Sequence, residues 1–181
     1  MKVFISDDDM CTTQKLNLAR VHKWFEANGC EVIDEIHGAD HAICMTCNGW
    51  SLLEHRSYER IQKTNQHSNH SRVIVMGCVV DAHMESVLKL HSGPVVQTKS
   101  SRPLSFTDIE PLFPNFRIPL ESVPAQSEFR RRNDYRDYDP KRVFLNIAEG
   151  CSFNCTFCTH KPGLANRRSR PMADILAQLE Q

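Results

Sequence analysis

The segment Arg72–Met76 reads Arg-Val-Ile-Val-Met and is the sequence feature that most limits the possible folds. An apolar run that does not alternate with polar residues indicates a strand buried on both faces, which is typical of a parallel sheet covered by helices. Candidate strands and candidate helices alternate around it, as that architecture requires. The candidate strands are Val3–Ser6, Glu31–Ile36 and His41–Met45, and the candidate helices are Leu16–Ala27, Ser51–Lys63 and Val80–Leu90. We therefore expect residues 1–98 to form a small, doubly wound α/β domain.

Two parts of different character follow this domain. Residues 99–139 contain five prolines and an arginine- and aspartate-rich run. Because proline removes backbone donors and breaks periodic structure, we expect a linker there. Residues 140–181 contain a candidate strand, Arg142–Ala148, then a loop with three cysteines and a helix that starts at Pro171. This last part is interpreted as a single βα unit.

Charge and cysteine content limit the classes of function that the chain can have. The 22 basic and 22 acidic residues cancel, so the whole chain carries no electrostatic signal for nucleic acid. We expect no membrane span, because no apolar run approaches 18 residues, and the acidic start is not a secretory signal. A cytoplasmic location keeps thiols reduced, so eight cysteines indicate metal or cluster ligation rather than disulfides.

Cys151, Cys155 and Cys158 place three thiols within eight residues. Three thiolates from one loop can hold three irons of a 4Fe-4S cluster and leave the fourth iron without a protein ligand. Clusters that only transfer electrons are closed by four cysteines, whereas an open iron can bind a substrate. The candidate strand before the loop and helix after it suit such a site, since ligands of α/β folds gather at the carboxyl ends of strands.

The spacing C-x3-C-x2-C, with Phe157 before the last cysteine, resembles the radical S-adenosylmethionine superfamily. The flanking stretches Asn146–Cys151 and Ser169–Pro171 resemble its methylthiotransferase branch, whose members modify tRNA adenosine or a ribosomal-protein aspartate. The resemblance implies a partial βα barrel in which the cluster on these cysteines binds S-adenosylmethionine. It also implies that Phe157 contacts the adenine of this cofactor, and simple packing within the loop is the alternative.

The amino-terminal part carries the same resemblance. The family's first domain has three further cysteines at strand ends that hold a second 4Fe-4S cluster, and the matching positions are Cys11, Cys47 and Cys78. Thr46-Cys47 and Gly77-Cys78 follow the family pattern. The family's Gly-Cys-Gln-x-Asn is replaced by Met10-Cys11-Thr12-Thr13-Gln14, and Met45 stands where asparagine is usual.

The resemblance implies a mechanism with both clusters. The cluster on the three cysteines of the 151–158 loop reduces S-adenosylmethionine to methionine and a 5′-deoxyadenosyl radical, which removes a hydrogen from the substrate. The second cluster delivers the sulfur, and a second S-adenosylmethionine methylates it. The implied partners are an electron donor and a substrate, foremost tRNA, with a ribosomal protein or a peptide as the alternative.

The length of the third part limits this expectation. A barrel of about six βα units needs roughly 190 residues, whereas residues 140–181 suffice for one unit. The chain is then a fragment, a split product that needs a second chain to complete the barrel, or a degenerate relative. Its lone strand and helix would be under-packed, and we do not expect this chain alone to catalyse the reaction.

Other interpretations of the cysteines remain open. Cys151, Cys155 and Cys158 can bind zinc with His160 as the fourth ligand. The three amino-terminal cysteines can be buried structural thiols. Cys44 forms a C-x2-C pair with Cys47 that suits redox chemistry or zinc, although a buried strand position is favoured for it, and Cys30 is assigned to the core. A non-catalytic iron–sulfur or zinc-binding protein is the corresponding alternative function.

Basic residues form two groups. Arg130, Arg131, Arg132 and Arg136 alternate with aspartates, which favours a solvated linker over an RNA contact. Lys161, Arg167, Arg168 and Arg170 lie near the proposed cluster and can meet a phosphate or remain solvated.

Overall fold

The central feature of the computed structural model is a five-stranded sheet with the order β2-β1-β3-β4-β5. The structure describes residues 1–6, 10–69, 72–98, 106–124, 144–158 and 167–180. The strands are β1 (Lys2–Ser6), β2 (Glu31–Ile33), β3 (His41–Thr46), β4 (Val73–Gly77) and β5 (Val95–Val96). All four neighbouring pairs run parallel, which confirms the predicted α/β class with a doubly wound sheet.

Side chains of the central strands alternate between two hydrophobic cores. In β4, Ile74 and Met76 enter one core, and Val73 and Val75 enter the other. Because successive side chains of a strand point to opposite faces, an unbroken apolar run fills both cores at once. The continuous pattern of Arg72–Met76 therefore predicted the burial of this strand correctly.

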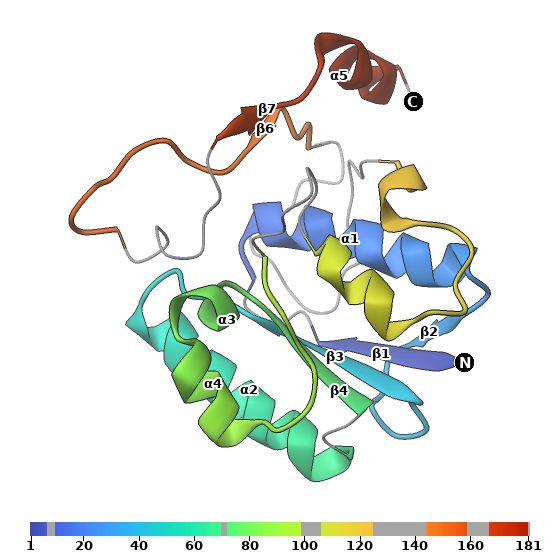
Figure 1. Cartoon of the computed structure of the whole chain (residues 1–181), viewed down its shortest axis with the longest axis vertical. Coiled ribbons are helices and arrows are strands. Elements are labelled where there is room, and N and C mark those ends of the chain that lie inside the picture. Colours follow the sequence, from blue (N-terminus) through green and yellow to red (C-terminus); the bar gives the residue numbers. More distant parts are fainter. Residues whose placement is uncertain (7–9, 70–71, 99–105, 125–143, 159–166, 181) are drawn as a thin grey trace.

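Helices cover both faces of the sheet (Figure 1). The helix α1 (Thr12–Ala27) covers one face, and α2 (Ser51–His67) and α4 (Met84–Leu90) cover the other. The predicted helix Val80–Leu90 is in fact two helices, because α3 (Cys78–Ala82) ends at His83, whose backbone leaves the helical region with φ −139° and ψ 48°. No helix in the described ranges is long and apolar enough to span a membrane.

The predicted linker 99–139 needs a correction, because residues 106–124 belong to the folded core. They form two short 3-10 helices, η2 (Thr107–Leu112) and η3 (Leu120–Ser122), beside α1 (Figure 1). Phe106 and Phe113 enter the same core as Trp24, and the Trp24 indole N–H donates to the carbonyl of Ile118 at 2.7 Å. The prolines separate short turns, and the apolar residues between them are buried. The remainder of 99–139 lies outside the described residues.

The described residues of the third part form two short strands and one helix. The strand β6 (Ala148–Glu149) pairs antiparallel with β7 (Arg168–Ser169), and α5 (Met172–Leu179) follows. The predicted strand Arg142–Ala148 is wrong for residues 144–147, which have no strand structure, and residues 142–143 are not described. The helix is confirmed. Its apolar residues are largely exposed (Met172 68%, Leu179 64%), as expected for an under-packed unit. The boundary expected at residue 139 lies outside the described residues and stays a prediction.

Candidate functional site

Three cysteines follow three neighbouring strands at one edge of the sheet. Cys11 precedes the first residue of α1 after β1, Cys47 directly follows β3, and Cys78 directly follows β4. The carboxyl ends of parallel strands meet at the same edge, and ligands bind where the strand order reverses, which in this order is between β1 and β3. The topology therefore gathers Cys11, Cys47 and Cys78 where an α/β fold places its ligands.

Two of these thiols, Cys47 and Cys78, have raised pKa values. Burial, as the largest cause, together with the neighbouring Cys11 and Cys47 raises the pKa of Cys78 to about 12. Burial also raises the pKa of Cys47, with Cys11 again contributing, while the Gly49 and Cys11 backbones lower it by hydrogen bonding. Cys47 and Cys78 are therefore neutral thiols at physiological pH unless a metal displaces their protons.

Gln14 approaches this group from the first turn of α1. Its amide nitrogen Nε2 donates a hydrogen bond to Sγ of Cys78 at 3.4 Å, and this contact lowers the pKa of the thiol. The other end of the amide, Oε1, is buried and has no hydrogen-bond partner among the described residues. Gln14 was not predicted as a site residue, because only the three-dimensional contact with Cys78 reveals it.

Two contacts fix the backbone beside the thiols. The backbone N–H of Cys47 donates to the hydroxyl of Ser57 at 2.9 Å, which anchors the end of β3 to α2. Gly77 has φ 109°, and a Cβ at this position would lie 2.3 Å from the carbonyl oxygen of Thr46. Glycine alone allows β4 to end this close to β3, so Gly77 determines where Cys78 lies.

The donor set favours a soft metal centre. Cys11, Cys47 and Cys78 supply only sulfur, and thiolates select iron–sulfur clusters or zinc over magnesium or calcium. Within the described part of the chain, no three His, Cys, Asp or Glu side chains are arranged to hold a metal ion. The all-sulfur donor set fits a cluster, and the three cysteines are free thiols in this structure.

The second cysteine group lies on an open loop. Cys151 and Cys158 are half-buried, Cys155 is exposed, and the N–H of Cys158 donates to the carbonyl of Cys155 at 3.2 Å. Phe157 is 86% exposed, so packing within the loop, the alternative role for this ring, is not what the structure shows. His160, the possible fourth zinc ligand, lies outside the described residues.

Arg170 has a structural role that the sequence did not reveal. Its guanidinium donates to the carbonyl of Asn146 at 2.6 Å, to the side chain of Gln178, and to the carbonyl of Asp174 at 3.1 Å. Arg170 thereby joins the segment before the cysteine loop to α5. Of the other members of the predicted basic group, Arg167 and Arg168 are exposed, and Lys161 is not described.

Cys30 and Cys44 are structural. Both are buried, and burial raises the pKa of Cys44 to about 11. Cys44 enters the core on the α2 side of the sheet, whereas Cys47 belongs to the core on the other side. The C-x2-C pair of Cys44 and Cys47 therefore does not form a joint redox or zinc site.

Comparisons with known proteins cover this part of the chain. Residues 10–97, which include Cys11, Cys47 and Cys78, match the family described as "Uncharacterized protein family UPF0004". The chain is 23% identical over 160 residues to a tRNA-2-methylthio-N(6)-dimethylallyladenosine synthase of Fervidobacterium nodosum, covering 88% of this chain and 36% of that protein. It is 27% identical over 173 residues to a ribosomal protein uS12 methylthiotransferase of Bradyrhizobium diazoefficiens, covering 94% of this chain and 37% of that protein.

A further ribosomal protein uS12 methylthiotransferase, from Xanthobacter autotrophicus, is 25% identical over 173 residues, covering 94% of this chain and 36% of that protein. The chain thus spans about a third of the length of the curated relatives it matches. It carries a UPF0004 domain and is related to the methylthiotransferases over most of its length.

Proposed function

We propose that this chain is a radical S-adenosylmethionine methylthiotransferase, or the amino-terminal portion of one, that works in the cytoplasm with two 4Fe-4S clusters. The observation that carries the proposal is the convergence of Cys11, Cys47 and Cys78 at one sheet edge within the UPF0004 domain. Each of these cysteines follows a different strand, so the three reach the ligand-binding edge together only when the whole sheet is folded. Burial alone does not require three thiols to meet there.

The two cysteine groups hold different clusters in this proposal. Cys151, Cys155 and Cys158 ligate the cluster that binds S-adenosylmethionine, beside the exposed ring of Phe157, and the three amino-terminal cysteines ligate the other. When bound, the clusters supply the electron that splits S-adenosylmethionine and the sulfur that is transferred. The protein ligates the clusters through thiolates, donates a hydrogen bond from Gln14, and shields Cys47 and Cys78 from water.

The proposed substrate is a tRNA adenosine. The Fervidobacterium relative is named for a product of this kind, and the uS12 enzymes make a ribosomal protein the second candidate. A row of cationic side chains on α2 favours RNA, because it lies beside the sheet edge that carries Cys11, Cys47 and Cys78 (the thiol edge). An electron donor is required in both cases, and a second chain that completes the barrel is proposed for full activity.

Electron paramagnetic resonance on the anaerobically reconstituted, dithionite-reduced chain tests the proposal. S-adenosylmethionine should change the spectrum of the wild type, because the ligand binds the open iron. A Cys11→Ser/Cys47→Ser/Cys78→Ser variant should keep this response, and a Cys151→Ser/Cys155→Ser/Cys158→Ser variant should lose it. A wild-type cluster whose spectrum ignores S-adenosylmethionine would indicate the alternative, a non-catalytic iron–sulfur protein.

A further inference from the structure

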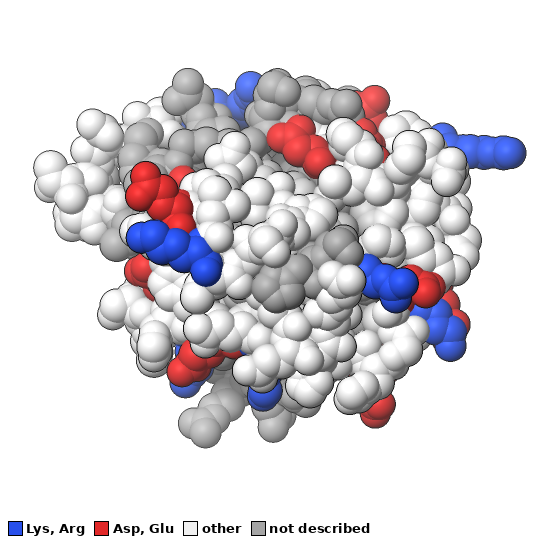
Figure 2. All heavy atoms as spheres, turned by 60° about the horizontal axis from the view of Figure 1, so that its bottom comes forward, with Lys and Arg blue, Asp and Glu red and all other residues white. Residues whose placement is uncertain are grey.

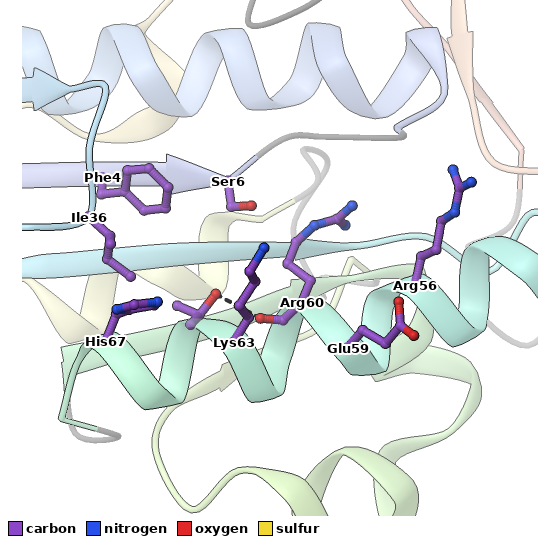
Figure 3. Close-up of a pocket in the computed structure, with 9 residues that line it drawn as sticks. Phe4, Ser6, Ile36, Arg56, Glu59, Arg60, Lys63 and His67 are labelled. Atoms are coloured by element: carbon purple, nitrogen blue, oxygen red, sulfur yellow. Dashed lines mark hydrogen bonds between the residues drawn. The ribbon is translucent and has the colours of Figure 1, made fainter.

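An open pocket of about 580 Å³ lies between α2 and the strand β1 (Figure 3). Apolar and small side chains from the sheet side, namely Phe4, Ser6 and Ile36, form one wall. The residues of α2 that line it are Arg56, Glu59, Arg60, Lys63, Thr64 and His67. The volume lies within the usual range of ligand-binding sites.

The pocket exists because one crossover of the sheet lacks a helix. β2 and β3 flank β1, and only residues 34–40 connect them. Crossovers between parallel strands usually contain a helix that covers the intervening strand. The short connection leaves Phe4 on β1 and Ile36 only half-buried, next to the core on the α2 side.

The α2 wall is a regular row of cationic or titratable side chains. Arg56, Arg60, Lys63 and His67 are spaced by four, three and four residues, so they share one helix face at about one residue per 5.4 Å turn. Among the described lining residues, Glu59 is the only acidic one, and its carboxylate lies 3.5 Å from the imidazole of His55 outside the pocket. Lys63 makes no ion pair with any residue that the structure describes.

The row points toward the thiol edge. The guanidinium of Arg60 donates to the carbonyl of Met45 at 2.9 Å, two residues before Cys47. Ser6, the last residue of β1, lies at the same end of the pocket, and Figure 3 shows the side chains of Arg56 and Arg60 toward this end. A long ligand in the pocket would therefore extend to the edge that carries Cys11 and Cys47.

From this arrangement we propose that the pocket binds a single-stranded segment of RNA, with its backbone along Arg56, Arg60 and Lys63. One cation per helical turn is a spacing on the order of that between consecutive phosphates of an extended strand. Phe4 and Ile36 offer an apolar surface to a base. On the face shown in Figure 2, the described Lys and Arg side chains lie in separate groups, most of them near Asp or Glu, so this face offers no continuous cationic surface to a double helix.

This inference rests on the proposed function in one respect: the bound RNA is taken to be the substrate that reaches the thiol edge. The binding itself needs no cluster. It is therefore testable on the full chain without iron, and loss of RNA binding would leave cluster assembly and the S-adenosylmethionine response unchanged. Failure of cluster assembly would in turn leave RNA binding unchanged.

Fluorescence anisotropy with a labelled single-stranded RNA 12-mer tests the site. With three Lys or Arg contacts, the binding constant of the wild type should fall about 20-fold between 50 mM and 200 mM salt. Lys63→Ala should weaken binding at low salt and reduce this salt effect to about sevenfold, as expected for two contacts. Arg56→Ala should act in the same way, since both side chains are exposed and their loss leaves the core intact.

Lys89→Ala is the matched control, because Lys89 is an exposed lysine on α4 that does not line the pocket. It should leave both the affinity and the salt effect near the wild-type values. Equal effects of Lys63→Ala and Lys89→Ala, no binding of the RNA, or equally tight and Lys63-dependent binding of poly-glutamate or an RNA duplex would each overturn the assignment.

Discussion

Gln14 donates its side-chain N–H to the sulfur of Cys78 across 3.4 Å, and both side chains are buried. A neutral thiol can donate to an amide oxygen or accept weakly from an N–H, and here the amide nitrogen faces the sulfur while Oε1 has no partner among the described residues. An N–H that points at sulfur suits a metal-bound thiolate, which only accepts. The orientation of Gln14 fits the ligated form of Cys78 that the proposed function requires.

Replacing this donor should make the amino-terminal cluster harder to reduce. Hydrogen bonds to ligating sulfur raise the reduction potential, because they stabilise the added negative charge. We expect Gln14→Leu to lower the potential by about 40 mV, which corresponds to about 1 kcal/mol of lost hydrogen bonding for one electron. A redox titration followed by electron paramagnetic resonance measures it, in a chain whose Cys151, Cys155 and Cys158 are serine.

Gln66→Leu, at an exposed position on α2, is the control for this titration. It should leave the potential unchanged. An unchanged potential in Gln14→Leu as well would show that the amide does not contact a cluster ligand.

Gly77→Ala should destabilise the fold. The new Cβ would lie 2.3 Å from the Thr46 carbonyl oxygen, and φ 109° is unfavourable for a residue with a side chain. We expect the free energy of unfolding to fall by about 3 kcal/mol in urea denaturation. Gly29→Ala shares a positive φ of 78° but meets no atom within 4 Å, so it should cost about 1 kcal/mol. Similar losses of unfolding free energy in both variants would show that the clash with the Thr46 carbonyl does not contribute.

Phe113→Ala should show that residues 106–124 stabilise the amino-terminal domain. The Phe113 ring lies 5.1 Å from that of Phe25 and 5.8 Å from that of Trp24, in edge-to-face arrangements. We expect a loss of about 3 kcal/mol in the free energy of unfolding. Phe153→Ala removes an equal ring that is 71% exposed and should change stability by less than about 0.5 kcal/mol. Equally small losses of stability in the two variants would show that residues 106–124 behave as a linker and do not stabilise the domain.

Acidification should destabilise the fold partly through His41. Burial lowers the pKa of His41 below its ordinary value of 6.5, and the nearby Asp40 opposes this effect only in part. The folded protein therefore binds a proton less readily than the unfolded chain, so stability from this group is complete above pH 6.5 and declines as the pH falls below it. Between pH 7 and pH 5, urea denaturation should show a larger loss of stability in the wild type than in His41→Gln.

If His41→Gln retained the wild-type pH dependence, burial of the imidazole would not contribute to acid sensitivity.

Patterns within single segments of the sequence predicted those elements whose burial depends on that segment alone. The continuous apolar run of β4 and the helical spacing in α1 and α5 each reflect the burial of one element, and these elements were found. The two-residue strand β5 carries too short a pattern to detect. The core position of Phe113 was missed, because the surrounding prolines resemble a linker and its partners Trp24 and Phe25 are far away in the sequence.

The candidate site likewise has features that the sequence could predict and features that it could not. The proposed ligand positions of Cys11, Cys47 and Cys78 came from a family resemblance and from strand ends, which sequence can show. The contact of Gln14 with Cys78 spans 64 residues, and the α2 row becomes a pocket only because a helix is missing from a crossover. Neither relationship has a local sequence signal.

Iron and sulfide per chain after anaerobic reconstitution test the central claim of two three-cysteine clusters most directly. The wild type should bind about eight irons, and serine at Cys11, Cys47 and Cys78, or at Cys151, Cys155 and Cys158, should leave about four in each case. Cys30→Ala, at a buried structural thiol, should retain about eight. Tight uptake of zinc with no iron or sulfide would contradict the account.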